Sequence, residues 1–227
     1  MKKLGTKHEN LDHKVYKRLK SMILERKLEP GAKIYQDKLA HELGISRTPL
    51  VNALKKLEQG KLIKAIPRRG FYVQRFSLKE MIHIFELREV LEGLAARRAC
   101  LHISDSQIEK LKHFFKGLKI SNDPKDLRNY AEEDRKFHHF LMEMGGSDFL
   151  SSILGTYNIL TFSYQGGFQA GLVRPPKETI REHLAVIEAI SNRDPDRAEE
   201  LARRHLKIST EKLRKDLEEE KGEDHED

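Results

Sequence analysis

The chain contains 227 residues, of which 38% are hydrophobic and 35% are charged. This length is enough for one large domain or two modest ones, each with its own core. No stretch approaches the roughly 20 consecutive apolar residues that a membrane span needs, and residues 1–10 lack the apolar segment of a secretory signal. The single cysteine, Cys100, excludes an internal disulfide framework. We therefore expect a soluble cytoplasmic protein with Cys100 in its core.

The net charge of +7 is unevenly distributed along the chain. Residues 1–76 contain 19 Lys and Arg against 7 Asp and Glu, whereas the remainder contains 24 against 29. A basic lobe joined to a mildly acidic one is expected when only the first lobe meets a polyanion. A solvated surface rich in lysine and glutamate would give a similar composition. Charge alone therefore does not decide between the two interpretations.

The pattern of apolar residues predicts a mainly α-helical chain that begins with a winged helix-turn-helix. Three helices and then two strands are expected, over about 11–27, 36–43, 46–60, 62–66 and 70–73. Ser46 is a good N-cap for the third helix. The basic turn Pro67-Arg68-Arg69-Gly70 joins the two strands. Three helices followed by a two-stranded wing form a DNA-binding module, which we assign to residues 1–76.

The way in which helix-turn-helix modules dock on DNA indicates which residues of this module contact it. The N-terminal end of the second helix of the pair enters the major groove, and here that end is Ser46-Arg47-Thr48. Arg47 can pair with guanine through two hydrogen bonds or bind a phosphate. The arginines of the wing tip can reach the minor groove, although each motif alone also fits an ordinary charged surface. The expected DNA-contacting residues are Ser46, Arg47, Thr48, Lys55, Arg68, Arg69 and Gly70.

From Ser77 onward the apolar period is helical, which predicts an all-α bundle of six to seven helices over residues 77–217. The individual helices are expected over about 77–101, 108–118, 124–144, 148–162, 177–191 and 195–217. Candidates for the buried side of the first helix are Ile82, Phe85, Leu87, Leu91 and Leu94. Residues 164–176 are rich in Gly and Pro and are expected to form a loop. Residues 218–227 hold seven acids and are expected to be a frayed acidic tail.

One group of residues in the second domain has the composition of a metal site. Asp134 and His138 are four residues apart, which places both on one face of a helix. With His183 and His205 they offer one carboxylate and three imidazoles, a donor set suited to Zn²⁺, Ni²⁺, Mn²⁺ or Co²⁺. Taken singly, each histidine is more often structural or exposed than a ligand. By spacing alone, two other histidines are equally eligible: His113 and His139.

The first 76 residues resemble the GntR family of transcription regulators. The resemblance is carried by Gly44-Ile45-Ser46-Arg47-Thr48-Pro49, preceded by Pro30-Gly31 and followed by Pro67-Arg68-Arg69-Gly70-Phe71-Tyr72-Val73. It implies binding to double-stranded DNA at an operator. Two positions depart from the family pattern. Val51 stands where the family usually has an arginine, and Asp37 where it often has a basic residue. We therefore expect the preferred DNA sequence, or the affinity, to differ from that of typical members.

The second domain resembles the FCD domain of the FadR-like subfamily. The matching residues include Leu87-Arg88, Asp134, Phe137-His138, Glu182-His183 and His205-Leu206. Metal-binding members use an Asp and three His, and the resemblance assigns these roles to Asp134, His138, His183 and His205. Members that bind acyl-CoA without metal lack this set. The resemblance further implies a cavity for a small carboxylate, to which Arg88 could offer its guanidinium, unless Arg88 pairs with Glu92 instead. Three further candidates for the pocket lining are Tyr157, Thr161 and Tyr164.

The expected function is that of a homodimeric regulator, most simply a repressor and not an enzyme. A carboxylate effector bound at the metal pocket would alter operator affinity, with the linker at about 75–78 as the pivot. A metal-dependent hydrolase could use the same cluster, but the sequence has no signature of an added general base. A purely structural metal is the other alternative. Adding metal and candidate acids to the protein would distinguish these three.

Overall fold

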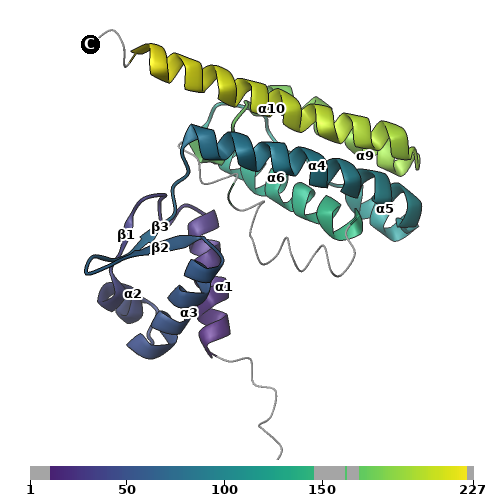
Figure 1. Ribbon diagram of the computed structural model, residues 1–227. Coiled ribbons are helices and arrows are strands. Elements are labelled where there is room, and N and C mark those ends of the chain that lie inside the picture. Colours follow the sequence, from purple (N-terminus) through teal and green to yellow (C-terminus); the bar gives the residue numbers. More distant parts are fainter. Residues whose placement is uncertain (1–10, 146–161, 163–168, 224–227) are drawn as a thin grey trace, which may run out of the picture. The chain divides into compact units, whose positions relative to one another are not determined.

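The computed structural model describes residues 11–145, 162 and 169–223 (Figure 1). The chain divides into two compact units, residues 1–75 and 76–227. The division falls within the segment that joins the last strand of the first unit to the first helix of the second. Each unit has its own secondary structure and core, and each is described by itself.

The N-terminal unit is a winged helix-turn-helix, as predicted. Its helices are α1 (Leu11–Leu24), α2 (Gln36–Glu42) and α3 (Arg47–Gln59), and its strands are β1 (Lys33–Ile34), β2 (Ile63–Ile66) and β3 (Gly70–Val73). The three strands form an antiparallel sheet in the order β1-β3-β2. The prediction contained β2 and β3 but not β1. A strand of two residues has no period of its own, and β1 exists only because it pairs with β3.

Spacing of apolar residues explains why α1 and α3 pack together. Val15, Leu19 and Ile23 are four residues apart and are all buried along one face of α1. Leu50, Leu54 and Leu57 of α3 have no exposed surface. Burying such side chains stabilises the unit by about 1.5–3 kcal/mol each. Within this unit, Arg47, Thr48, Lys55 and Lys56 of α3 are exposed.

The second unit is helical throughout its described part. It contains α4 (Leu78–His102), α5 (Asp105–Leu111), α6 (Pro124–Gly145), the short 3-10 helix η1 (Gln169–Gly171), α9 (Pro176–Ser191) and α10 (Pro195–Glu223). The predicted caps Ser77 and Ser104 both form capping boxes, with Glu80 and Gln107 respectively. These caps fix where α4 and α5 begin.

In this unit α4 packs against both α10 and α6, and α9 packs against α10 (Figure 1). The shared core contains Tyr130 and Phe137 of α6 together with Ile190 of α9, all nearly without exposed surface. Cys100 is buried in the same core, as expected, and burial raises the pKa of its thiol. Gly145 lies against the backbone of α4, where a Cβ atom would be 1.9 Å from the carbonyl oxygen of Ala95. The approach of α6 to α4 therefore requires glycine at this position.

Several boundaries differ from those predicted. The second helix of the bundle, α5, ends at Leu111. It could not reach 118 as predicted, because Phe115 and Gly117 both have positive φ. The last helix, α10, continues through Glu223 into the segment expected to be a frayed tail. The predicted helix at 148–162 lies outside the described residues apart from Phe162, as do Tyr157, Thr161 and Tyr164.

The buried side of α4 was also predicted only in part. Ile82 and Phe85 are buried, but Leu87 and Leu94 are among the exposed large hydrophobic residues and Leu91 is half-buried. The prediction was wrong for Leu87 and Leu94 because it assumed that every apolar residue faces the bundle. In the structure the buried side of α4 instead includes polar residues, Arg88 and Glu92.

Candidate metal centre and nucleic-acid interface

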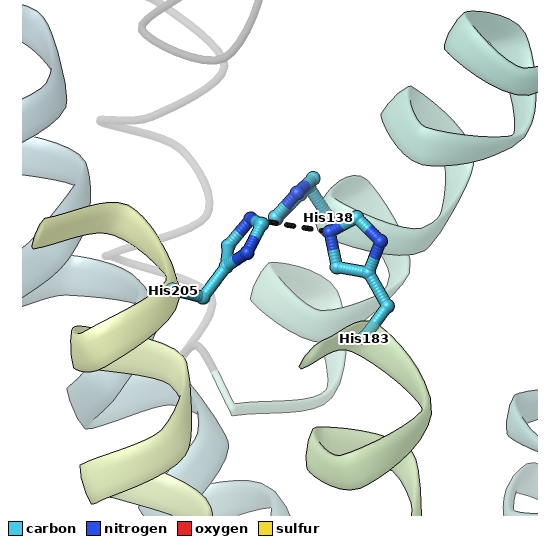
Figure 2. A group of neighbouring side chains, drawn as sticks. All are labelled: His138, His183 and His205. Carbon is cyan, nitrogen blue, oxygen red and sulfur yellow. Dashed lines mark hydrogen bonds between the residues drawn. The ribbon is translucent and has the colours of Figure 1, made fainter. Parts of the chain in front are cut away.

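Three histidines from three helices meet in the centre of the second unit. His138 lies on α6, His183 on α9 and His205 on α10, and Figure 2 shows their rings converging. A potential ligand atom from each lies within 4.8 Å of those of the others. The Nε2 atoms of His183 and His205 are 3.1 Å apart. All three side chains are buried.

Each of two histidines is held by a carboxylate, which in turn is held by an arginine. The Nδ1 atom of His138 donates to Oε2 of Glu92 at 2.5 Å, and Nε of Arg88 donates to Oε1 of the same carboxylate at 2.6 Å. These partners are buried, with Arg88 and Glu92 on adjacent turns of α4. The predicted alternative for Arg88, an ion pair with Glu92, is therefore present. Its effect is to fix the ring of His138.

The same arrangement recurs at His205. Its Nδ1 atom donates to Oε2 of Glu182 at 2.6 Å, and Arg174 donates two parallel hydrogen bonds to Glu182, at 2.9 and 2.5 Å. Arg174 also reaches the backbone carbonyl of His205 at 3.0 Å. Both arrangements direct Nδ1 outward, so that Nε2 of each histidine faces the centre of the cluster.

His183 is oriented by uncharged hydrogen-bond partners. Its Nδ1 atom is 3.0 Å from the hydroxyl of Tyr130, which is 2.8 Å from the hydroxyl of Thr179. If Nδ1 carries the proton and donates to Tyr130, the Tyr130 hydroxyl donates onward to Thr179, and Nε2 is left with its lone pair. Phe115 stacks on the His183 ring, with centroids 4.9 Å apart and planes within 6°. Phe115 adopts a positive φ of 63°, a conformation that bulky residues rarely take.

Burial favours the neutral form of two of the three imidazoles, which is the form that coordinates a metal. Burial, with the neighbouring His205 and His138, lowers the pKa of His183 well below its usual value, and burial also lowers the pKa of His205. Neutral imidazole is the form that binds metal. Burial would raise the pKa of Glu92, but the charges of Arg88 and His138 outweigh it and lower the pKa to about 2. The pKa of Glu182 is likewise lowered to about 2, because hydrogen bonds from Arg174 and His205 outweigh its burial.

Asp134 completes the cluster predicted from the sequence. Its Oδ1 atom lies 3.4 Å from Nε2 of His183 and 3.8 Å from Nε2 of His138. A cavity of about 30 Å³ adjoins these groups. Residues from four helices and the segment before α9 line it: Phe85, Arg88, Asp134, His138, Gly171, Leu172, Val173, Arg174, Thr179, His205 and Ser209. The space is sufficient for an ion or one or two water molecules.

These residues fit a transition-metal ion. Two nitrogens that each lie ~2.1 Å from a metal are ~3.0 Å apart at right angles, close to the spacing of the His183 and His205 Nε2 atoms. Metal-bound histidines also donate their other ring nitrogen to a carboxylate or another acceptor, as His138 and His205 do here. The other two eligible histidines lie apart from the cluster: His139 is exposed beside Glu143, and His113 is exposed beside the carbonyl of Glu109.

Sequence reasoning missed several residues around the cluster. Tyr130 could have been found, because it lies one turn before Asp134 on the buried face of α6. Glu182 was noted only as part of a motif and Glu92 only as an alternative partner for Arg88. Arg174 lies in the Gly- and Pro-rich stretch, where no period exists to place a side chain. Phe115 lies beyond the end of α5, so helical spacing gives no information about its ring.

The predicted DNA-contacting residues all lie on the surface of the N-terminal unit. Ser46, Arg47 and Thr48 are exposed at the start of α3, and Ser46 holds the N-cap position with extended backbone angles, although its hydroxyl makes no capping hydrogen bond. Nη1 of Arg47 is 3.5 Å from Oδ1 of Asp37, and both side chains are largely exposed. Asp37, one of the two departures from the family pattern, therefore lies directly beside the main recognition arginine.

The wing tip presents its arginines from a tight turn. The backbone N–H of Arg69 donates to the carbonyl of Ile66 at 2.9 Å, so Pro67 and Arg68 occupy the central positions. Arg68 and Gly70 both have a positive φ, of 63° and 95° respectively. Both arginines are exposed. A non-glycine residue in this conformation carries a conformational cost of order 1–3 kcal/mol, which is common where a side chain has a binding role.

Each of the two units matches a known protein family. Residues 11–73 match the family described as bacterial regulatory proteins, gntR family, and residues 83–207 match the FCD domain. The chain belongs to the GntR family. It is of the FadR-like type, in which an FCD domain follows the helix-turn-helix. The GntR match implies DNA binding, and the three-histidine cluster lies within the FCD match.

Relatives of this GntR-family protein align over most of their length. The HTH-type transcriptional repressor RspR of Escherichia coli (strain K12) is 26% identical over 211 residues, 90% of this chain and 89% of that protein. An uncharacterized HTH-type transcriptional regulator of Bacillus subtilis, YdhC, is 29% identical over 215 residues, covering 90% and 91%. These relatives are transcription regulators by name.

Solved structures share the fold. A putative GntR regulator from Rhodococcus superposes with a TM-score of 0.75 at 15% identity, covering 89% of this chain and 96% of that one. The Escherichia coli protein McbR/YncC gives 0.73 at 17% identity, covering 92% and 100%. Among the helices that the structure describes, none combines the length and apolar character required to cross a bilayer.

Replacing Tyr130 by Phe tests how His183 is held. Loss of the hydroxyl removes the acceptor for Nδ1 of His183, so we expect zinc affinity to fall about 10–100-fold, measured by calorimetry. The matched control is Tyr35→Phe, which removes a phenol from an exposed side chain in the N-terminal unit and should leave zinc affinity unchanged. Equal affinities for the wild type and Tyr130→Phe would contradict this account of the site.

Replacing Arg68 by Gly separates DNA binding from stability at the wing. Glycine accepts a positive φ without strain, so the melting temperature should be maintained or increase. DNA affinity should fall, and its salt dependence should decrease by about one unit of slope if one phosphate contact is lost. Arg193→Gly is the control, since Arg193 also has a positive φ, of 53°, but lies in the second unit. A loss of DNA affinity in both variants, or in neither, would contradict the assignment.

Proposed function

We propose that this protein is a transcriptional repressor whose operator affinity is controlled by a small carboxylate effector, bound at a metal-containing pocket in the FCD domain. The observation that carries the proposal is the convergence of three buried imidazoles, of His138, His183 and His205, on one point. Two of them are oriented by carboxylates, the buried Glu92 and the half-buried Glu182. A bundle that needed only a core would not require this much buried polar structure.

The metal would be held by His138, His183 and His205 together with Asp134. When bound, the ion would supply open coordination positions for the oxygens of an effector carboxylate. The donor set suits Zn²⁺, Ni²⁺, Mn²⁺ or Co²⁺. The role of Glu92, Glu182 and Tyr130 would be to orient the three imidazole rings through their Nδ1 atoms.

Two arginines at the cavity would bind an anionic effector. Arg88 and Arg174 both line it, and both are buried. Each is paired with a carboxylate, so each would donate hydrogen bonds to an effector only after a shift of side chains. Arg88 remains the proposed effector-binding residue from the sequence, and Arg174 joins it.

The small size of the cavity supports coupling between effector and DNA. Its volume of about 30 Å³ between the described residues is less than a sugar acid or hydroxy acid needs. An effector must therefore enlarge the pocket, and α4 supplies part of the wall through Phe85 and Arg88. Because α4 begins immediately after the junction of the two units, we propose that its displacement is transmitted through residues 75–78. The effector acts only if it binds the two arrangements unequally.

On the DNA, we propose a symmetric homodimer at an inverted repeat. Ser46, Arg47 and Thr48 would enter the major groove and Lys55 would attract its backbone. Arg68 and Arg69, beside Gly70, would bind at the minor groove. Repression, as opposed to activation, is proposed by analogy with the RspR relative, which is named a repressor.

Gel-shift titration against DNA from upstream of the protein's own gene tests the DNA-binding half. Arg47→Ala should reduce affinity by about 1–3 kcal/mol, roughly 5- to 150-fold, with a loss of discrimination between bases. Arg193→Ala removes an exposed arginine from the second unit and should have no effect. Binding that is insensitive to both salt and the Arg47 substitution would exclude this reading of the interface.

Thermal-shift measurements test the proposed response to an effector. The protein is measured with each metal alone, with each of a panel of sugar and hydroxy acids alone, and with metal and acid combined. A sensor should be stabilised further by one acid only when metal is present. Equal stabilisation by metal with or without acid would favour a structural metal, and consumption of the acid would indicate a hydrolase. His183→Ala should abolish the metal-dependent shift.

A further inference from the structure

An acidic side chain lies beside the arginine that is expected to contact DNA. Asp37, in the first turn of α2, is 86% exposed, and its Oδ1 atom lies 3.5 Å from Nη1 of Arg47, which is 64% exposed at the start of α3. The two residues meet because Gly44, with a φ of 62°, makes the turn between the helices, and α2 packs against α3 (Figure 1). The fold of the unit therefore sets the position of this acid.

Folding stability does not account for a carboxylate at this place. An ion pair between two side chains as exposed as these contributes little to stability, because water screens the charges. The phosphates of DNA repel an acid and attract the exposed lysines nearby, Lys38 on α2 and Lys55 and Lys56 on α3. A carboxylate on such a surface lowers the affinity for DNA of any sequence unless it accepts a hydrogen bond from a base.

The position of Arg47 brings the carboxylate within reach of base edges. The N-terminal residues of a recognition helix contact the edges of bases in the major groove, and Arg47 is the first residue of α3. Neighbouring base pairs are ~3.4 Å apart along the duplex. This spacing matches the 3.5 Å between the Asp37 and Arg47 atoms. When Arg47 binds one base pair, Asp37 is therefore beside the next.

The chemistry of a carboxylate restricts which base it can bind. An ionised carboxylate only accepts hydrogen bonds, whereas the guanidinium of Arg47 only donates them. In the major groove guanine and thymine present acceptors, adenine presents an amine next to the acceptor N7, and cytosine presents its N4 amine without a neighbouring acceptor. Cytosine is therefore the base that suits Asp37, and guanine is the base that suits Arg47.

We propose that Asp37 is a specificity-determining residue of the DNA interface. Its carboxylate accepts a hydrogen bond from the N4 amine of a cytosine in the base pair next to the guanine that Arg47 binds. The inference rests on the proposed function, because it requires Arg47 in the major groove. It adds a second base-reading residue, on α2, and a guanine next to a cytosine in the operator. Asp37 lowers the affinity for other sequences by repulsion and maintains the affinity for this one.

Selection from a pool of random duplex DNA by the full-length protein tests the assignment. The wild type should enrich sites with a guanine next to a cytosine, Arg47→Ala should lose the guanine, and Asp37→Ala should keep the guanine and lose the cytosine. Glu42→Ala is the matched control, since Glu42 is another exposed carboxylate of α2, paired with Lys38, and both preferences should remain. A cytosine preference that survives Asp37→Ala, or that Glu42→Ala also removes, would overturn the proposal.

Affinity measurements on the enriched site separate base reading from a general effect of charge. N4-methylcytosine still pairs with guanine but carries a methyl group on the amine that faces the major groove. Replacing the cytosine by thymine or by N4-methylcytosine should weaken wild-type binding at least ~5-fold, and should change the binding of Asp37→Ala by less than ~2-fold. Both alanine variants should bind unrelated DNA slightly more tightly, because each has lost one negative charge.

An acid in the first turn of α2 could instead serve only to stabilise that helix. Asp37→Ala would then lower the melting temperature, and the wild type would bind the N4-methylcytosine site as tightly as the cytosine site, which would overturn the proposal. The measurement on N4-methylcytosine needs only the wild type, so it decides the question even if Asp37→Ala does not fold.

Failure of this inference differs from failure of the proposed function. If Arg47 selects a guanine but the preference at the neighbouring position does not depend on Asp37, the DNA interface stands and the role of Asp37 is wrong. If the wild type enriches no sequence, or Arg47→Ala enriches the same sites, both are wrong. Because all variants are compared in the same buffer, the result is independent of the response to metal and acid.

Discussion

The geometry of the histidine cluster depends on what the Nδ1 atoms contact. Glu92 and Glu182 accept from His138 and His205, and each carboxylate is bound by an arginine. Burying ionised groups costs several kcal/mol per ion unless they are paired, and removing one member of a buried pair typically destabilises by about 3–5 kcal/mol. Such pairs contribute little net stability compared with apolar packing. Their effect here is positional, because they fix which nitrogen of each ring faces the centre.

The first helix of the second unit connects the parts of the molecule that the function requires. Its buried face carries Arg88 and Glu92 beside the cluster. Its N-terminus, capped by Ser77, follows the junction between the two units. Under the proposed function, a change in the pocket that moves α4 would act on the segment that joins the two units.

The sequence predicted the features that depend on neighbouring residues, and it missed those that depend on contacts between distant segments. Local signals placed the caps Ser77 and Ser104 and the helices that follow them, since a capping box is contained within four residues. The four-residue spacing of Asp134 and His138 correctly placed both on the buried face of α6. Contacts between distant segments were not accessible in this way. Arg174 reaches Glu182 and His205 from an irregular segment, and Leu87 and Leu94 were expected in a core that instead holds Arg88 and Glu92.

X-ray absorption spectroscopy of the zinc-loaded protein tests the central claim most directly, because it counts the imidazoles around the ion. The account predicts a shell at ~2.0–2.1 Å with the multiple-scattering pattern of three imidazole rings and with oxygen completing the coordination. A shell of oxygen alone, or one with fewer than two imidazoles, would mean that the convergence of His138, His183 and His205 serves packing and not a metal.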